Sequence, residues 1–295
     1  MSDAPLFDKH DITHIRGVDH PESIGIGPGG EAYTTGTGCQ VYRLNLEDNV
    51  GEQFASTEAR CLGTAVDADG NLYAAHTAGD VLKITPDGEV SVYGTPEEGE
   101  VFHCTNYPAF DRQGRMYVSE SGDWSGELNG GLFRIEPGGG VAERWYPQAV
   151  DTPNAIALDA EERNLYFVEP FGAGIARVAI AADGSAGKLE RVLHMPRHVP
   201  DGIAFDTEGR RRSTVGPRGR RRCQRGRGAA WGGAVRGLPP PRRPRGRGRA
   251  RRRRGRNPAA RAWLVCACGL VPFVRSPGGT YLVRAQRHRN LLKPH

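Results

Sequence analysis

Short apolar segments alternate with tight, glycine-containing turns along the first two thirds of the chain. Five segments share one pattern: an apolar strand, an acidic or small residue, a turn and a second apolar strand. In the four complete copies the second strand reaches a tyrosine, and the fifth copy stops before its second strand. Alternating apolar and polar positions are typical of half-buried β-strands, and an Asp-x-x-Gly turn suits a hairpin. The segments begin at Ser23, Gly63, Tyr107, Ala155 and Gly202.

The spacing of these segments predicts the fold. The tyrosines that close the first four copies lie 40, 44 and 49 residues apart, and a third apolar strand follows each of these copies. Four strands in every 40 to 50 residues or so is the spacing of blades in a β-propeller. We therefore predict an all-β, six-bladed β-propeller with four complete blades. The fifth blade is expected to be interrupted in mid-hairpin, and the C-terminal third to be disordered or poorly folded.

Charge divides the chain into two unlike parts. Residues 1–210 hold all 34 acidic residues and 15 of the 40 basic ones, whereas residues 211–295 hold 25 basic residues and no acidic one. Residues 210–256 contain 20 arginines in 47 positions and too few apolar residues to form a core. The expected divisions are an N-terminal segment (1–17), propeller blades (18–209), an Arg/Gly/Pro-rich low-complexity segment (210–256) and a short apolar and basic tail (257–295).

The arginine-rich segment has two interpretations. An arm that binds nucleic acid has this composition, but only Trp231 is available to stack on bases, and the segment starts where a blade strand is due. We favour a coding sequence that is read out of register after about Arg210, because GC-rich coding sequence in a wrong frame is rich in Arg, Gly, Pro and Ala. We therefore do not expect nucleic acid as a partner. Such a frame shift could leave the chain inactive by disrupting its ring, although residues 262–284 are apolar enough for two strands.

Four side chains that carry oxygen occupy the same phase of the repeat, next to the start of a blade's first strand. The loops that lead into the first strands of a propeller converge on its central channel. One such residue alone is most simply a turn residue that bonds to local backbone, but four at one phase indicate a shared site. Two carboxylates and two amides suit Ca²⁺ or Mg²⁺, and Mn²⁺ or Zn²⁺ remain alternatives. The four residues are Glu22, Asn106, Asn154 and Asp201; the second blade has Leu62 and Gly63 there and is expected to contribute no ligand.

These segments resemble the six-bladed propellers of the gluconolactonase, senescence marker protein (regucalcin) and luciferin-regenerating enzyme family. The resemblance covers about residues 18–210, and its most specific parts are Pro153-Asn-Ala-Ile-Ala-Leu-Asp and Pro200-Asp-Gly-Ile-Ala-Phe-Asp. It implies one divalent metal ion as cofactor. The ligands that it implies are Glu22, Asn154 and Asp201, with Asp201 also as the general base and Asn106 as a substrate contact.

The function that the resemblance implies is a metal-dependent hydrolase that opens a small sugar-acid-type or related lactone. In such a reaction a metal polarises the carbonyl and a carboxylate activates water, so a small-molecule lactone is the expected partner. The loop that follows Glu120 is expected to form a pocket wall, where Trp124 either stacks on a ring substrate or packs on the surface. Cys104 stands where sugar-acid lactonases of the family often have arginine, which argues against a gluconate-type substrate.

Two alternatives stay open at this point: a non-catalytic propeller that binds a ligand or a protein, and a strictosidine-synthase-like enzyme. No apolar run reaches the roughly 18 residues that span a bilayer, and the first residues lack a signal-peptide pattern. We therefore expect no membrane partner and a cytoplasmic location. The six cysteines form no Cys-x-x-Cys pair, so neither a zinc knuckle nor a disulfide framework is indicated.

The nucleotide sequence around codon 210 tests the reading-frame hypothesis. Residues 217–223 can be encoded so that a shift of one base reads Pro-Glu-Asp-Val-Val-Val, which is a plausible blade strand. We expect a neighbouring frame downstream of codon 210 to encode further propeller-like strands. A neighbouring frame without such text would contradict the hypothesis.

Overall fold

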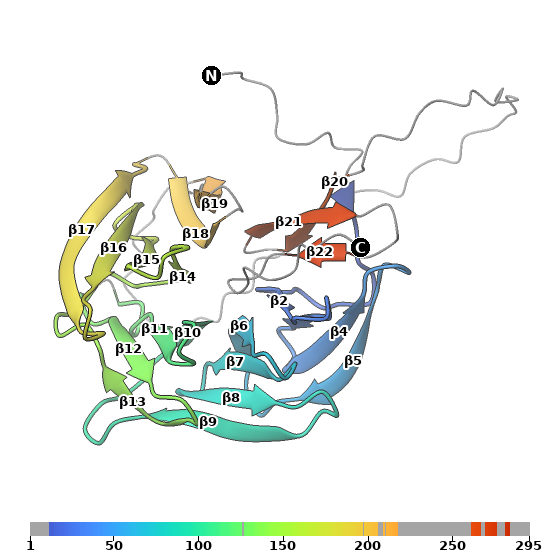
Figure 1. Cartoon of the computed structure of the whole chain (residues 1–295), viewed down its shortest axis with the longest axis horizontal. Coiled ribbons are helices and arrows are strands. Elements are labelled where there is room, and N and C mark those ends of the chain that lie inside the picture. Colours follow the sequence, from blue (N-terminus) through green and yellow to red (C-terminus); the bar gives the residue numbers. More distant parts are fainter. Residues whose placement is uncertain are drawn as a thin grey trace, which may run out of the picture.

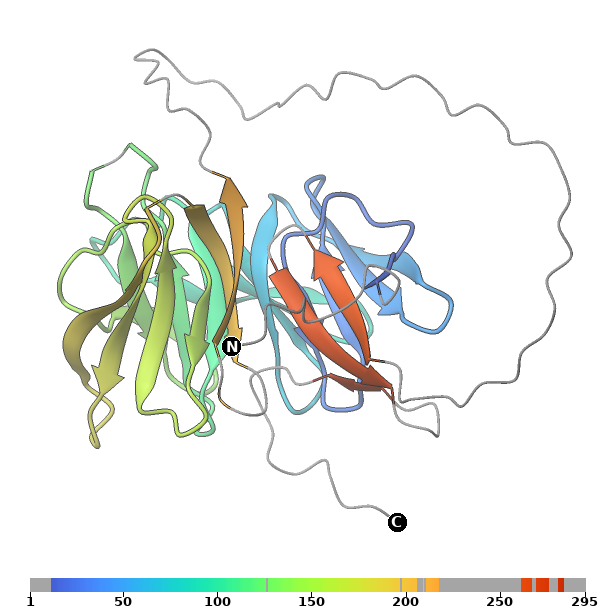
Figure 2. The same ribbon diagram turned by 90° about the horizontal axis from the view of Figure 1, so that it is seen from above.

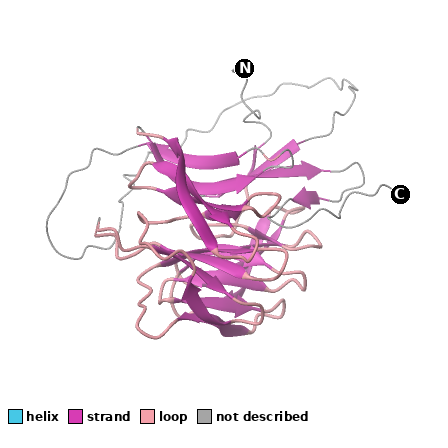
Figure 3. Ribbon diagram, turned by 60° about the vertical axis from the view of Figure 1, so that its left-hand side comes forward, coloured by secondary structure: helices cyan, strands magenta, loops and turns pink. Residues whose placement is uncertain are grey.

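All regular elements in the described part of the chain are β-strands (Figure 3). The computed structural model describes residues 12–125, 127–196, 198–205, 209, 211–217, 261–266, 269–275 and 281–283. Among these residues, no helix is long and apolar enough to cross a membrane. The all-β prediction is confirmed.

Four four-stranded blades follow one another along the chain and stand around a ring (Figure 1). Within each blade, strands that are consecutive in sequence pair antiparallel, and the first strand lies nearest the centre of the ring. A short parallel pairing of β9 with β13 also joins the second and third blades at the rim. The strands are β2 (Gly25–Ile26), β3 (Ala32–Thr35), β4 (Gln40–Asn45) and β5 (Val50–Ser56); β6 (Cys61–Val66), β7 (Leu72–His76), β8 (Asp80–Ile84) and β9 (Val90–Pro96); β10 (Thr105–Phe110), β11 (Met116–Glu120), β12 (Gly131–Ile135) and β13 (Gly140–Arg144); and β14 (Ile156–Leu158), β15 (Asn164–Glu169), β16 (Gly174–Ile180) and β17 (Ala186–His194).

Two further sheets, one of two strands and one of four, continue the ring beyond the fourth blade. The fifth blade consists of β18 and β19, which pair antiparallel, and the last sheet has the order β1-β20-β21-β22 with β1 and β20 parallel. The last sheet stands between the fifth blade and the first (Figures 1 and 2). Segments from the two ends of the chain therefore meet in one sheet. These strands are β1 (Ile12–Thr13), β18 (His198–Phe205), β19 (Arg211–Pro217), β20 (Arg261–Cys266), β21 (Gly269–Arg275) and β22 (Tyr281–Val283).

In the described part of the chain the fifth blade has two strands, and β19 carries it one strand beyond the end of the repeat pattern at residue 210, so the hairpin is complete. The apolar tail forms three strands where two were expected. Residues 1–11 and 218–260, which include most of the arginine-rich segment, lie outside the described residues. The expected domain boundaries stay a prediction.

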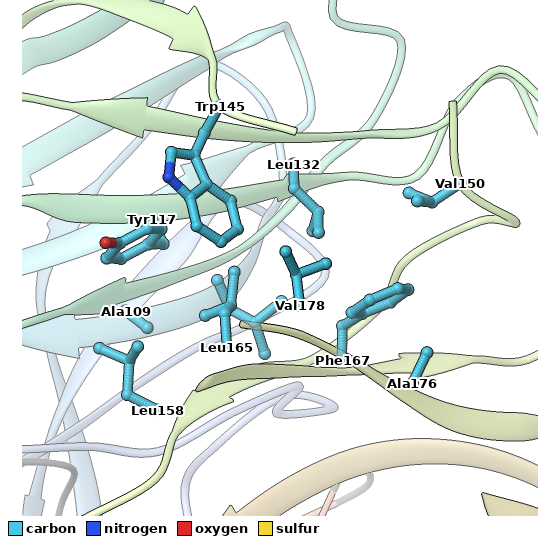
Figure 4. Close-up of a cluster of buried hydrophobic side chains, with 11 residues drawn as sticks. Ala109, Tyr117, Leu132, Trp145, Val150, Leu158, Leu165, Phe167, Ala176 and Val178 are labelled. Atoms are coloured by element: carbon cyan, nitrogen blue, oxygen red, sulfur yellow. The ribbon is translucent and has the colours of Figure 1, made fainter. Parts of the chain in front are cut away.

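Apolar side chains between neighbouring blades form the core. One cluster joins the inner parts of the third and fourth blades (Figure 4). In it, Trp145 meets the ring of Tyr117 edge-on with the centroids 5.0 Å apart, and the indole N–H donates to the carbonyl of Gly184 at 2.9 Å. Phe167 and Leu165 of the fourth blade are fully buried in the same cluster. Each blade thus buries its apolar face against the next one, so the fold depends on blades being neighbours.

The aspartate of the repeat fixes the hairpin between the first and second strands. In the second blade, Asp67 Oδ1 accepts the backbone N–H groups of Asp69 and Asn71, each at 2.9 Å. The other oxygen accepts the Asn71 amide and the Tyr73 hydroxyl, again at 2.9 Å. Asp111 bonds to its own turn in the third blade in the same way. The Asp-x-x-Gly pattern is therefore a side-chain-to-backbone turn, as its composition predicts.

Hydroxyl groups link one blade to the start of the next. Thr35, at the end of β3, donates its hydroxyl to the carbonyl of Cys61 at 2.9 Å. Ser121, directly after β11, donates to the carbonyl of Pro153 at 2.8 Å. Both donor side chains are buried. Because each bond runs from the end of a second strand to the residues that begin the next blade, it fixes the position of the next inner strand.

The turn aspartates give the fold a dependence on pH. Burial alone would raise the pKa of Asp67, but hydrogen bonds from Asn71, Tyr73 and Asp69 outweigh burial and lower the pKa below its ordinary 3.8. The stabilisation by this carboxylate is therefore fully present above pH 3.8 and is lost as the pH falls through the lowered folded-state pKa. We expect Asp67→Asn to reduce the free energy of unfolding by about 1 kcal/mol at neutral pH and by much less in strong acid. Urea unfolding at both pH values measures this, and an equal deficit at both would contradict it.

The link between the third and fourth blades is tested by Ser121→Ala. We expect the change to reduce the free energy of unfolding by about 1–3 kcal/mol, because the carbonyl of Pro153 and the side-chain amide of Asn106, which donates to Ser121 Oγ at 2.8 Å, lose their partner. Ser125→Ala is the matched control, since this exposed serine in the following loop should change the value by less than about 0.5 kcal/mol. Similar small effects in the two urea unfolding curves would show that the link does not hold the blades together.

Candidate functional site

The sequence-predicted residues lie where the inner strands begin, and several of these strands are irregular there. The register of β10 against β11 shifts at Asn106, and that of β18 against β19 shifts at Asp201 and Gly202. The same shift occurs in β6, at Leu62 and Gly63. A β-bulge bends its strand and changes the direction of a side chain, and bulges are frequent beside active sites. Asn106 and Asp201 therefore share a backbone irregularity, whereas β2 after Glu22 and β14 after Asn154 pair without a register shift.

Asn154 and Asp201 are brought together, although they belong to different blades. The backbone N–H of Asn154 donates to the carbonyl of Val168 at 2.9 Å, and its carbonyl accepts the hydroxyl of Ser119 at 2.7 Å. With the backbone held in this way, the side chain hydrogen-bonds the carboxyl group of Asp201. Burial raises the pKa of Asp201, and the bond from Asn154 opposes this only in part. A half-buried carboxylate with a neutral partner is stabilised by a cation beside it, so this pair fits a metal ligand.

Glu22 pairs with a residue that the sequence pattern did not single out. Arg60 directly precedes β6 of the second blade, and its guanidinium forms an ion pair with the carboxylate of Glu22 in the first blade. Burial raises the pKa of the Cys104 thiol, and the positive charge of Arg60 opposes this shift. Arg60 therefore contacts the first blade through Glu22, and its charge acts on Cys104 of the third. The second blade, from which no ligand was expected, contributes a cation to this end of the ring.

Asn106 is held in a fixed orientation. Its side chain is 4% exposed and donates to the hydroxyl of Ser121, which in turn donates to the carbonyl of Pro153. Ser121 thus connects Asn106 to the residue before Asn154. Sequence reasoning missed this serine; the available signal was a run of polar residues at the end of a strand that is otherwise apolar.

Glu120 anchors the segment that leads to Asn106. The carboxylate is 2% exposed, and one oxygen accepts the backbone N–H groups of His103 and Cys104 at 2.9 and 2.7 Å. The second oxygen accepts the N–H of Gly122 at 2.9 Å. Burial raises the pKa of Glu120, and these three bonds oppose the shift without cancelling it. Its role is to position backbone rather than to meet a ligand.

Trp124 stands in the loop after β11, on the same side of the ring as Asn106. The side chain is 44% exposed, and the backbone adopts a left-handed φ of 57°. Its ring meets that of Phe171 edge-on at 5.6 Å, and its side chain hydrogen-bonds the thiol of Cys104. The arrangement forms an aromatic wall next to Cys104, which leaves part of the indole available to a ligand.

The donor set suits a hard divalent ion by its chemistry. In the described part of the chain, no three His, Cys, Asp or Glu side chains gather closely enough to hold a metal ion. The expected ligands are instead two carboxylates and an amide, all of which bind through oxygen. The structure joins Asn154 to Asp201 and pairs Glu22 with Arg60.

Comparison with known proteins places the blades in a family. The sequence profile of the SMP-30/Gluconolactonase/LRE-like region matches residues 37–220, more than half of the chain. The lactonase drp35 of Staphylococcus saprophyticus is 25% identical over 160 residues, which are 50% of this chain and 47% of that protein. The lactonase drp35 of Staphylococcus haemolyticus is 20% identical over 186 residues, 58% of this chain and 55% of that protein. The chain spans about half the length of the curated relatives that it matches.

Solved structures of similar fold agree with the profile. A gluconolactonase from Xanthomonas campestris superposes with a TM-score of 0.60 at 19% identity, over 68% of this chain and 71% of that one. Regucalcin, a calcium-binding protein from Agrobacterium tumefaciens, gives a TM-score of 0.55 at 16% identity over the same shares. Identities this low show a shared fold and no more. The profile match over the blades shows the family: the chain belongs to the SMP-30/gluconolactonase/LRE-like proteins.

Proposed function

We propose that this protein is a metal-dependent hydrolase that opens a small lactone. Membership of the family supports the proposal, since the curated relatives quoted above are named lactonases. The observation that carries it is the bond between Asn154 and Asp201, which sets a half-buried carboxyl group beside an amide at the bulged start of an inner strand. Oxygen ligands of this kind, at the end of a propeller where several blades converge, suit a hard divalent ion.

In the proposed site, Glu22, Asn154 and Asp201 hold one divalent ion. Ca²⁺, Mg²⁺, Mn²⁺ and Zn²⁺ are the candidates, and the calcium-binding regucalcin of similar fold favours testing Ca²⁺ first. When bound, such an ion polarises the lactone carbonyl and stabilises negative charge on its oxygen. The expected partner is a small lactone, and the proposed location is the cytoplasm.

Asp201 is the proposed general base. The attacking water gives one proton to this carboxylate as its oxygen bonds to the lactone carbonyl carbon. The protonated carboxyl group then returns the proton to the ring oxygen that is released when the ring C–O bond breaks. The bond from Asn154 restricts rotation of the carboxyl group, so the proton is accepted from a fixed direction.

Asn106 and Trp124 are the proposed substrate contacts. The amide of Asn106 is oriented by Ser121, and it offers a polar group to the ring or its substituents. The exposed part of Trp124, supported by Phe171 and Cys104, offers an apolar face against which a ring can stack.

Metal binding to the full-length chain and to three variants tests this function. We expect one divalent ion per chain in equilibrium dialysis with Ca²⁺ and with Mn²⁺. Glu22→Gln, Asn154→Ala and Asp201→Ala should each weaken binding by about 100-fold or more, because each removes a ligand. Lactone hydrolysis, followed by acid release in a weakly buffered solution, should fall in parallel.

Asp183→Asn is the control, because this exposed carboxylate bonds only within its own turn in the described structure, to Ser185. If metal binding and hydrolysis are indifferent to all three site variants, the enzyme hypothesis is wrong. A chain that binds small molecules without hydrolysing any lactone would favour the non-catalytic propeller.

A further inference from the structure

Arg60 places a permanent positive charge at the end of the ring that carries the proposed site, and its backbone is held firmly. The N–H of Ala59 donates to His76 Nε2 at 2.9 Å, and the other ring nitrogen lies 2.5 Å from Asp80 Oδ1. The N–H and the hydroxyl of Thr77 both donate to the carbonyl of Arg60 at 2.9 Å. The start of the second blade therefore presents this side chain from a fixed base.

The guanidinium of Arg60 has donor capacity left. It forms the ion pair with Glu22, but its Nε is buried and has no hydrogen-bond partner within the described structure. A buried N–H on a cation is costly until an acceptor reaches it. Arginine offers five N–H groups in a planar fork that matches a carboxylate. An additional anion is the partner that this side chain can still accept.

Other acidic groups around the site are already engaged. Glu120 is held by three backbone N–H groups, and Asp201 is bonded to Asn154. The thiol of Cys104 is kept neutral, since burial raises its pKa. An ion bound to Glu22 and Asp201 would weaken the hold of Glu22 on Arg60, while Glu120 keeps its own three backbone partners. In the loaded site the guanidinium of Arg60 can therefore bind an acid group of a ligand.

We propose that Arg60 is the anion-recognition residue of the channel site, and that the lactones it accepts carry an acid group on the ring. The inference rests on the proposed function and deepens it. Arg60 pairs with Glu22, at the proposed metal end, and its charge also acts on Cys104, whose thiol hydrogen-bonds Trp124. In the proposed mode of binding the ring stacks on the aromatic wall formed by Trp124, its reacting carbonyl faces the metal ligands, and its acid group pairs with the guanidinium.

Two lactones that differ only in the acid group test the proposal. These are γ-butyrolactone and 5-oxotetrahydrofuran-2-carboxylate, used with the full-length chain and saturating Ca²⁺. We expect wild type to favour the carboxylated lactone by about 10- to 100-fold in kcat/KM, the worth of one charge-assisted hydrogen bond. Arg60→Met should abolish most of this preference through KM, and Arg60→Lys should restore part of it.

Arg112→Met is the matched control. Arg112 lies in the turn between β10 and β11, at the other end of the third blade, where it pairs with Glu162. The variant should therefore keep the full preference for the carboxylated lactone.

Binding of the carboxylated lactone, measured by calorimetry on the same proteins, separates the inference from the proposed reaction. Binding that depends on Arg60 in a chain that hydrolyses neither lactone would retain the anion site and overturn the hydrolase. Hydrolysis with no preference for the acid group, or with equal losses on both lactones in Arg60→Met, would retain the hydrolase and overturn the anion site. Absence of both binding and hydrolysis in wild type would overturn both.

Discussion

The hydroxyl-to-carbonyl bonds between blades are the interaction on which the site depends. Thr35 holds the carbonyl of Cys61, directly after Arg60, and Ser121 holds the carbonyl of Pro153, directly before Asn154. A propeller blade buries its apolar face against its neighbour, but apolar contact alone permits sliding. A directional bond to a fixed backbone atom removes that freedom. Residues contributed by different blades can therefore meet with constant geometry.

The strands and turns were predictable because their causes are local. Alternating apolar positions and the Asp-x-x-Gly turns are properties of short segments, and the structure pairs Asp67 with its own turn as that composition requires. The common phase of the candidate residues was also visible, since repeats bring equivalent positions to equivalent places. The backbone bulges at Asn106 and Asp201 were not visible, because a bulge is defined by the partner strand and not by the strand itself.

Arg60 and Ser121 escaped prediction for a different physical reason. Their roles arise from side chains that reach another blade, over a separation in sequence that no local pattern encodes. The shared position in the repeat identified side chains with oxygen, so it did not identify Arg60, a cation one residue before β6. The same limit explains the last sheet, where β1 pairs with β20 across almost the whole length of the chain. Apolar composition indicated strands in that tail but could not indicate their partner.

The pairing of Glu22 with Arg60 makes the metal and the ligand interdependent in the proposed site. Without an ion, the guanidinium is the counter-charge of Glu22, so an ion must compete with Arg60 for that carboxylate. With an ion in place, the attraction of Arg60 to Glu22 is weakened and its N–H groups are available to an acid-bearing lactone. Each of the two ligands therefore strengthens the binding of the other, and thermodynamic linkage requires the two effects to be equal. A site that contained only oxygen ligands would lack this coupling, which follows from the one basic residue at the start of the second blade.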